Sequence, residues 1–280
     1  MAIGGEACAA AFSGTDEVVG NVLSAAVKEG ESLVEMARAY GLGFSEIAGA
    51  NPETDPFVPG AGARVTIPAQ WIVPEAVREG ALIINLSEMR LYYRFTVKGS
   101  ILLVTFPVGI GSEGTETPLG GYRIVEKTVD PVWHVPKSIR KEKPELPGTV
   151  PPGPDNPLGT HALRLSSNDI LIHGTNKPWG VGRKVSHGCL RLYPEDIVRL
   201  FGLVPSGTLV KIVREPVKVG IKGERVYLEV HHDDHDTRDL LEEAMRVLYV
   251  KGALGRVSMG KVLQAVGGTH GIPVDVTRRN

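Results

Sequence analysis

Apolar and polar residues alternate along much of the middle of the chain, a pattern typical of strands that bury one face against a core. The predicted strands are residues 82–85, 90–95, 101–108, 122–125, 162–165, 169–173 and 208–213. A turn at Ser87-Glu88 joins the first two, and a short helix that begins with Pro194 precedes the last. Residues 78–214 are therefore expected to form a mainly-β domain.

A unit with helical spacing precedes this domain. Val27 is expected to open a strand, Ser32 to cap a helix over residues 33–40, and Ser45 to begin a second helix. Alternation returns at residues 64–68, which predict a closing strand. Residues 25–70 are thus predicted to be a small βααβ module, and the whole chain to be an α+β multidomain protein.

The two ends of the chain differ from these units. Residues 215–280 predict a short helical extension of undetermined role, with apolar residues at helical spacing over 238–250 and 259–266 and one strand at 226–230. Residues 1–24 are interpreted as a leader or flexible tail. The run Ala7 to Phe12 resembles the end of a signal peptide, although no charged start precedes it. It is either a trimmed export signal or a disordered start.

Composition narrows the function. Among 280 residues, 31 are Lys or Arg and 32 are Asp or Glu, so a formal charge of −1 gives no electrostatic basis for a nucleic-acid partner. No apolar stretch is long enough to span a membrane. The 34 glycines and 20 prolines suit a turn-rich protein of strands. A proline-rich run at residues 136–157 predicts an irregular loop of the kind that often serves as a lid.

Two cysteines cannot build a disulfide framework, so Cys189 is interpreted as a reactive thiol. A cysteine nucleophile needs a base to take its proton and donors for the developing oxyanion. His187 is two residues away, and His173 is sixteen residues away but could reach the thiol through space. Gly188 would let the backbone turn sharply and direct N–H groups at a carbonyl.

Zinc is the alternative for these side chains. His173, His187 and Cys189 are all metal-ligand types, but a fourth ligand is not obvious. The run His231 to Asp236 also contains metal-ligand types, and a solvated charged linker is the favoured interpretation. The prediction is an enzyme without a metal or cofactor.

Two motifs carry a family resemblance. Ile172-His173-Gly174-Thr175-Asn176, followed by Ser186-His187-Gly188-Cys189-Leu190-Arg191-Leu192, resembles the signature of the L,D-transpeptidases with a YkuD-type catalytic domain. Residues 117–124 and 156–159 support the match. The family implies that Cys189 is the nucleophile, that His173 is the general acid/base, and that the Gly174 carbonyl orients the imidazole.

The same resemblance implies roles for neighbouring residues. The oxyanion hole would be built from backbone N–H groups around His187, Gly188 and Cys189. Ser186 and Arg191 would position the loop or the substrate. Apart from the resemblance, three further residues are expected to contact the substrate: Thr175, Trp133 and Trp179. Ordinary core or loop packing is the alternative for the two tryptophans.

Residues 25–70 resemble a LysM domain, a module that binds the N-acetylglucosamine-containing glycan of peptidoglycan or chitin. The match rests on Gly30-Glu31-Ser32-Leu33, Tyr40-Gly41, Ala50-Asn51-Pro52 and Val65-Thr66-Ile67-Pro68. The expected function is transfer of a peptidoglycan tetrapeptide stem from a cysteinyl acyl-enzyme to an amine of another stem or of a lipoprotein. The alternatives are an L,D-carboxypeptidase or a silent peptidoglycan-binding protein. Such substrates imply export to the periplasm or cell wall.

Overall fold

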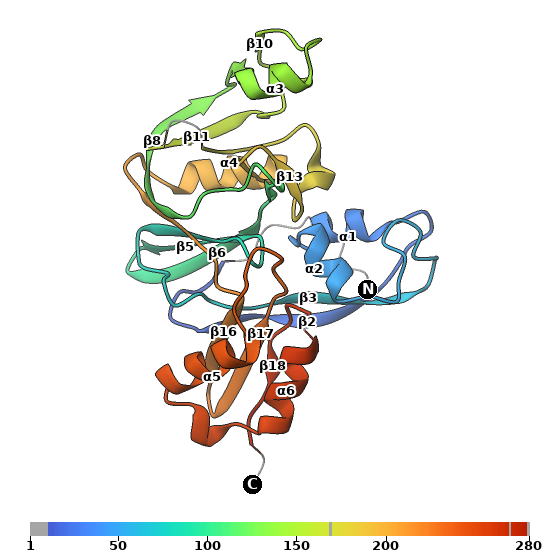
Figure 1. The fold of residues 1–280 in the computed structure, drawn as a ribbon, viewed down its shortest axis with the longest axis vertical. Coiled ribbons are helices and arrows are strands. Elements are labelled where there is room, and N and C mark those ends of the chain that lie inside the picture. Colours follow the sequence, from blue (N-terminus) through green and yellow to red (C-terminus); the bar gives the residue numbers. More distant parts are fainter. Residues whose placement is uncertain (1–10, 168–169, 269, 279–280) are drawn as a thin grey trace.

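The computed structural model describes residues 11–167, 170–268 and 270–278. Its centre is a nine-stranded mixed sheet with the strand order β1-β6-β5-β4-β15-β8-β11-β12-β14 (Figure 1). The strands are β1 (Phe12–Ser13), β4 (Ala81–Asn85), β5 (Arg90–Val97), β6 (Ser100–Pro107), β8 (Gly120–Val129), β11 (His161–Leu165), β12 (Leu171–His173), β14 (Leu190–Arg191) and β15 (Leu209–Val213). The predicted mainly-β domain is therefore present.

The sheet buries one large apolar cluster, which includes Leu82, Phe106, Leu163, Ile172 and Leu190. Helix α4 (Pro194–Leu203) adds Ile197 and Leu200 to this cluster. Proline in its first turn and acidic residues beside it suit the amino end of a helix. A short parallel pair, β7 (Ile110–Gly111) with β13 (Lys184–Ser186), lies beside the main sheet.

The predicted order strand, helix, helix, strand is present in the N-terminal unit, but its first strand lies elsewhere than expected. The elements are β2 (Val18–Ala26), α1 (Leu33–Ala39), α2 (Phe44–Gly49) and β3 (Arg64–Ile72). Ser32 caps α1 and forms a capping box with Glu35. The prediction that Val27 opens a strand is wrong, since β2 ends at Ala26.

The interpretation of residues 1–24 as a flexible leader is wrong wherever the structure describes them. Strand β1 pairs with β6 of the main sheet, and β2 pairs with β3 along its whole length from Val18 to Ala26. Val18 and Val19 are buried by this pairing. Residues 1–10 lie outside the described part, so Cys8 and most of the signal-like run receive no structural account.

The N-terminal unit shares its core with the main sheet. One apolar cluster contains Leu33, Met36 and Ile67 from the N-terminal unit together with Ile83, Tyr92 and Leu103 from β4, β5 and β6. Figure 1 shows α1 and α2 on one side of β3, against the main sheet. Burial of a common core means that the two parts stabilise each other.

The C-terminal region is more than a helical extension. A three-stranded sheet of β16 (Val217–Lys222), β17 (Arg225–Val230) and β18 (Val274–Asp275) packs against α5 (Leu240–Val250) and α6 (Met259–Gly268), with a short 3-10 turn η2 (Leu254–Arg256) between them. These elements enclose their own apolar cluster. The helices agree with the prediction, but the strands β16 and β18 were missed.

The proline-rich segment forms the opposite end of the molecule (Figure 1). It contains α3 (Lys137–Glu142) and β10 (Thr149–Val150), and β10 pairs with β9 (Trp133–His134), which directly precedes the segment. Another 3-10 turn, η1 (Pro178–Gly180), precedes β13. Within the described residues, no helix is long and apolar enough to cross a membrane.

Candidate active site

One face of four neighbouring strands forms the floor of a cleft. Strand β12 pairs in parallel with β14, so that His173 lies opposite Arg191. Strand β11 places Ala162 opposite both His173 and Thr128 of β8. Side chains at alternate positions of a strand share a face, so these rows present their side chains together. Cys189 directly precedes β14 and belongs to the same row as Arg191.

The cleft has a volume of about 730 Å³. Predicted site residues His173, Ser186, His187, Cys189 and Arg191 line it. Residues 131–139 form the opposite wall, with Trp133, Pro136 and Ile139 facing the cavity. Pro157 and Leu158 also line it, so both ends of the proline-rich segment border the cleft.

His173 is held in one tautomer. Its side chain is buried, and its Nδ1 lies 2.6 Å from the backbone oxygen of Gly174. A carbonyl oxygen only accepts hydrogen bonds, so Nδ1–H must be the donor, and Nε2 then carries the lone pair. Burial, with the positive charge of Arg191 acting in the same direction, lowers the pKa of His173 to about 4. At neutral pH this imidazole is therefore an unprotonated base.

The chain around Cys189 is tied down by hydrogen bonds. Ser186 Oγ donates to the carbonyl oxygen of Cys189 at 2.5 Å. The Ser186 carbonyl in turn accepts from Ser112 N at 2.9 Å and Thr115 Oγ1 at 3.1 Å. Gly188 adopts φ +93°, a conformation that side chains disfavour, so glycine is required at this turn. Cys189 itself is half-buried.

Arg191 supplies positive charge inside the cleft. Burial lowers its pKa, while the neighbouring Cys189 opposes that effect. Its Nε is buried with no hydrogen-bond partner among the described residues. The guanidinium therefore favours an anion nearby, either a thiolate or a substrate carboxylate.

His187 is engaged elsewhere. Its Nε2 lies 3.2 Å from Glu142 Oε2 at the end of α3, and its side chain is half-exposed. His187 thus connects the loop that precedes Cys189 to the proline-rich segment. The contact leaves His173 as the better-placed base.

The three residues predicted to contact substrate are distributed differently. Trp133 lines the cleft. Trp179 lies in η1, is 56% exposed and is not among the residues that line the cleft. Thr175 is buried, and its Oγ1 accepts a hydrogen bond from Lys177 N. The structure therefore brings only Trp133 of the three to the cleft.

Several cleft residues were missed from the sequence. Glu126 and Arg164 form an exposed ion pair of 2.6 Å at the cleft, and Thr128 lies beside them. The alternation of apolar and polar residues predicted strands at 122–125 and 162–165. It did not predict that β8 and β11 pair, which brings Glu126, Thr128 and Arg164 together. The sequence also gave no indication that the loop at residues 112–117 donates hydrogen bonds to the Ser186 carbonyl.

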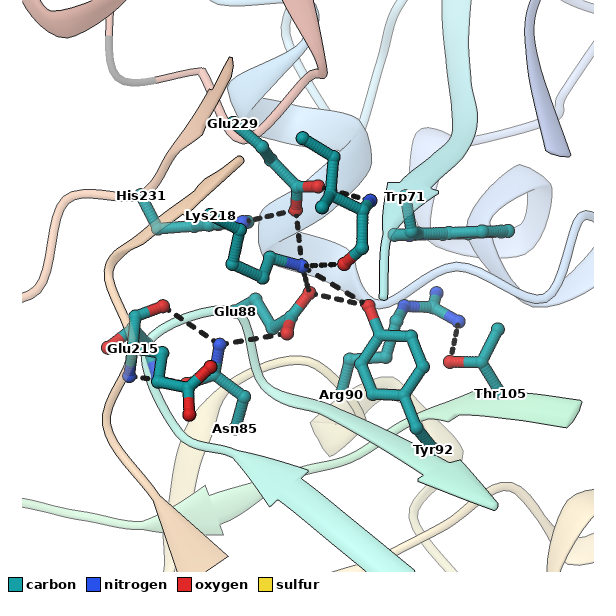
Figure 2. Close-up of polar contacts among 12 residues, drawn as sticks. Trp71, Asn85, Glu88, Arg90, Tyr92, Thr105, Glu215, Lys218, Glu229 and His231 are labelled. Atoms are coloured by element: carbon teal, nitrogen blue, oxygen red, sulfur yellow. Dashed lines mark hydrogen bonds and ion pairs between the residues drawn. The ribbon is translucent and has the colours of Figure 1, made fainter. Parts of the chain in front are cut away.

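Potential metal ligands gather away from this cleft. In the described part of the chain, Glu88, Glu229 and His231 are the one group of His, Cys, Asp or Glu side chains close enough to hold an ion. The Lys218 ammonium lies between the carboxylates, 2.6 Å from Glu88 and 2.8 Å from Glu229 (Figure 2). The lysine already provides the positive charge that these carboxylates need.

The run His231 to Asp236 is only partly the solvated linker that was expected. His231 is buried and lies 2.7 Å from Glu229, and Asp233 is buried against Ser87 and Arg214. His232 and Asp234 are exposed. The burial follows from the C-terminal sheet docking on the turn at Ser87.

Comparison with known proteins identifies the family of this chain. Residues 79–212 match the YkuD family model, described as the L,D-transpeptidase catalytic domain. The "Probable L,D-transpeptidase YcfS" of Escherichia coli strain K12 is 39% identical over 268 residues, covering 89% of this chain and 82% of that protein. The chain belongs to the L,D-transpeptidase family.

This L,D-transpeptidase has further relatives. The "Probable L,D-transpeptidase ErfK/SrfK" of Salmonella typhimurium is 37% identical over 278 residues, covering 93% of this chain and 88% of that protein. A solved L,D-transpeptidase from Mycobacterium smegmatis superposes with a TM-score of 0.36 at 19% identity, over 48% of this chain and 58% of that one. So limited a superposition adds nothing to the assignment, which rests on the sequence relatives.

Proposed function

We propose that this L,D-transpeptidase acts on peptidoglycan tetrapeptide stems through a thioester on Cys189. The Cys189 thiol gives its proton to His173 Nε2, and the sulfur attacks the carbonyl that joins the L-centre of the diamino acid to the terminal D-alanine. The C–N bond breaks, and D-alanine leaves with the proton from His173. An amine then attacks the thioester carbonyl and gives a proton to His173, the C–S bond breaks as the new amide forms, and His173 returns the proton to the Cys189 sulfur.

The observation that carries this proposal is the fixed tautomer of His173 in the cleft that Cys189 lines. The Gly174 carbonyl accepts the hydrogen bond from Nδ1–H, which leaves the lone pair, and so the basicity, on Nε2. Backbone N–H groups of His187, Gly188 and Cys189 are proposed to stabilise the oxyanion, because the positive φ of Gly188 marks a sharp turn in the chain beside the cleft. Ser186 positions this loop, and Arg191 stabilises negative charge beside it.

The N-terminal unit is proposed to bind glycan strands as a LysM module. Its α2–β3 loop exposes Phe57 and Val58, which are 60% and 77% exposed. Aromatic and apolar side chains on a surface loop suit the face of a sugar ring. Substrates of this kind place the protein outside the cytoplasmic membrane, in the periplasm or cell wall.

Mass spectrometry of reaction products tests the proposed function. Purified protein is incubated with a tetrapeptide stem, with and without a second stem or a lysine-ending lipoprotein peptide as the amine. The proposal predicts a crosslinked product with loss of D-alanine. Tripeptide alone in the presence of every amine would instead identify an L,D-carboxypeptidase.

A further inference from the structure

The start of α2 forms backbone hydrogen bonds with the segment that leads to the nucleophile. Phe44 N donates to Val181 O at 3.1 Å, and Ser45 N donates to Gly182 O at 3.2 Å. Ser45 Oγ donates to the same Gly182 oxygen at 2.6 Å. The N-terminal unit and the catalytic domain therefore meet through their main chains, which leaves little freedom for one to slide past the other.

Two glycines make this approach possible. A Cβ on Gly43 would lie 2.7 Å from Gly182 Cα, and a Cβ on Gly182 would lie 2.4 Å from Gly43 Cα. Real Cβ atoms do not approach other atoms so closely, so neither position accepts a side chain without a backbone shift. The close contact is built into the backbone at both positions.

The contact continues directly to Cys189. Gly182 N donates to Val108 O, and Ile110 N donates to Arg183 O. Strand β13 then pairs with β7, and Ser186 at its end holds the Cys189 carbonyl. Gly182 lies seven positions before Cys189, and hydrogen bonds hold most of the residues between them.

The chain that follows Cys189 also contacts the N-terminal unit. Tyr193 OH donates to Leu42 O at 3.0 Å, and Arg38 forms two hydrogen bonds with Glu195, of 2.8 and 2.7 Å. Near the first contact, the Arg183 guanidinium lies 3.5 Å from the centre of the Phe44 ring. The α1–α2 region thus contacts the chain on both sides of the Ser186 to Cys189 motif. It binds residues 181–183 before the motif and residues 193–195 after it.

We propose that the N-terminal unit positions the segment of residues 181–189, which carries Cys189. Catalysis at Cys189 would then depend on the N-terminal unit. Gly43, Phe44 and Ser45 act as positioning residues through the 181–189 segment. This inference rests on the proposed role of Cys189. It differs from a pure targeting role, in which the unit would bind glycan and leave turnover of soluble peptides untouched.

The test compares Gly43→Ala with Gly49→Ala. Both glycines lie in or at the end of α2 and neither has a positive φ, but a Cβ on Gly49 meets its nearest atom at 3.8 Å. We measure kcat and KM with soluble stem peptides, the pH profile of Cys189 alkylation by iodoacetamide, sacculus binding, and the thermal melt. A loop displaced by a fraction of an ångström costs about 10-fold to 100-fold in rate.

The expected result is a drop of that size in kcat for Gly43→Ala, an altered alkylation profile, an unchanged KM and unchanged sacculus binding. Gly49→Ala should match the parent protein. If Gly43→Ala does not fold, Ser45→Ala removes only the Oγ hydrogen bond to Gly182, and a smaller loss of kcat in the same direction is expected. A folded variant with the parent kcat and alkylation profile would overturn the inference.

Cys189→Ala separates this inference from the proposed function. If Cys189→Ala retains turnover, the proposed nucleophile is wrong whatever Gly43→Ala does. If Cys189→Ala is inactive and Gly43→Ala behaves as the parent protein, the positioning role alone is wrong.

Discussion

His173 and Cys189 reach one cleft because β12 and β14 are parallel neighbours, although the two residues are sixteen positions apart in sequence. Nearness in sequence favours His187, yet that residue contacts Glu142 of α3. The carbonyl of Gly174 selects the tautomer of His173 that leaves Nε2 basic. In the proposed mechanism, this single backbone oxygen takes the orienting role that a carboxylate has in other triads.

Replacing each histidine in turn distinguishes the base. His173→Gln should lower kcat by about 10²-fold to 10⁴-fold, the usual contribution of a positioned general base. His187→Gln keeps its backbone N–H and should lose less than about tenfold. Steady-state transfer assays on soluble stem peptides measure both. Equal losses in the two variants would count against His173 as the base.

The lowered pKa of His173 predicts a pH-dependent stability. The folded protein resists protonation down to a pKa of about 4, whereas the unfolded chain takes up a proton near the ordinary value of 6.5. Between these values the unfolded state binds more protons, so the free energy of unfolding falls as pH falls, by about 3 kcal/mol in full.

Urea denaturation at about pH 7 and about pH 4.5 measures this effect. Asp196 acts with the opposite sign, because burial raises its pKa to about 7 and its folded form binds a proton first. His173→Gln retains Asp196, so the difference between parent and variant isolates the histidine. Identical pH dependence in the two proteins would refute the assigned pKa.

At the scale of elements, strand prediction succeeded where alternation was long enough. The expected segments 82–85, 90–95 and 162–165 correspond to β4, β5 and β11. Strands β7, β13 and β14 span two or three residues, too short for any period to appear. The motif therefore identified Cys189 and His173, but the floor of the cleft depends on long-range pairing that no local pattern encodes.

Lys218 holds β16 against the rest of the molecule. Its ammonium contacts Glu88, Glu229 and the Ile72 carbonyl, all buried (Figure 2). Lys218→Met would leave two buried carboxylates without their cation and should lower the free energy of unfolding by about 3–5 kcal/mol. Lys222→Met, on the exposed end of the same strand, is the matched control. Similar denaturation midpoints for both variants would show that the buried network contributes little.

At the scale of the whole molecule, the N-terminal unit, the main sheet and the C-terminal unit pack against one another and are not separated by flexible linkers. The N-terminal unit and the catalytic sheet bury one apolar cluster, and Glu229 of the C-terminal unit accepts a hydrogen bond from Ile72 N of β3. The sequence suggested separable modules because each part of the chain has its own spacing of apolar residues, alternating in the middle and helical in the parts that flank it. Strands β1 and β2, which the sequence suggested were part of a leader, add to these contacts by pairing with β6 and β3.

Removing residues 11–72 tests this integration. The truncated protein would expose Ile83, Tyr92 and Leu103, which are at most 1% exposed in the intact chain. We expect a lower thermal midpoint, aggregation, and loss of turnover on soluble peptides as well as on sacculi. A truncated protein that melts and reacts like the parent would show that the N-terminal unit is an independent module.

The central claim is that Cys189 carries the acyl group, and the mass of the intact protein during turnover tests it most directly. With a tetrapeptide stem and no amine acceptor, the parent protein should gain the mass of the acyl group, and peptide mapping should place it on Cys189. Cys189→Ala should gain no mass and release no D-alanine while keeping the parent's circular dichroism. An adduct on another residue, or turnover by Cys189→Ala, would contradict the account.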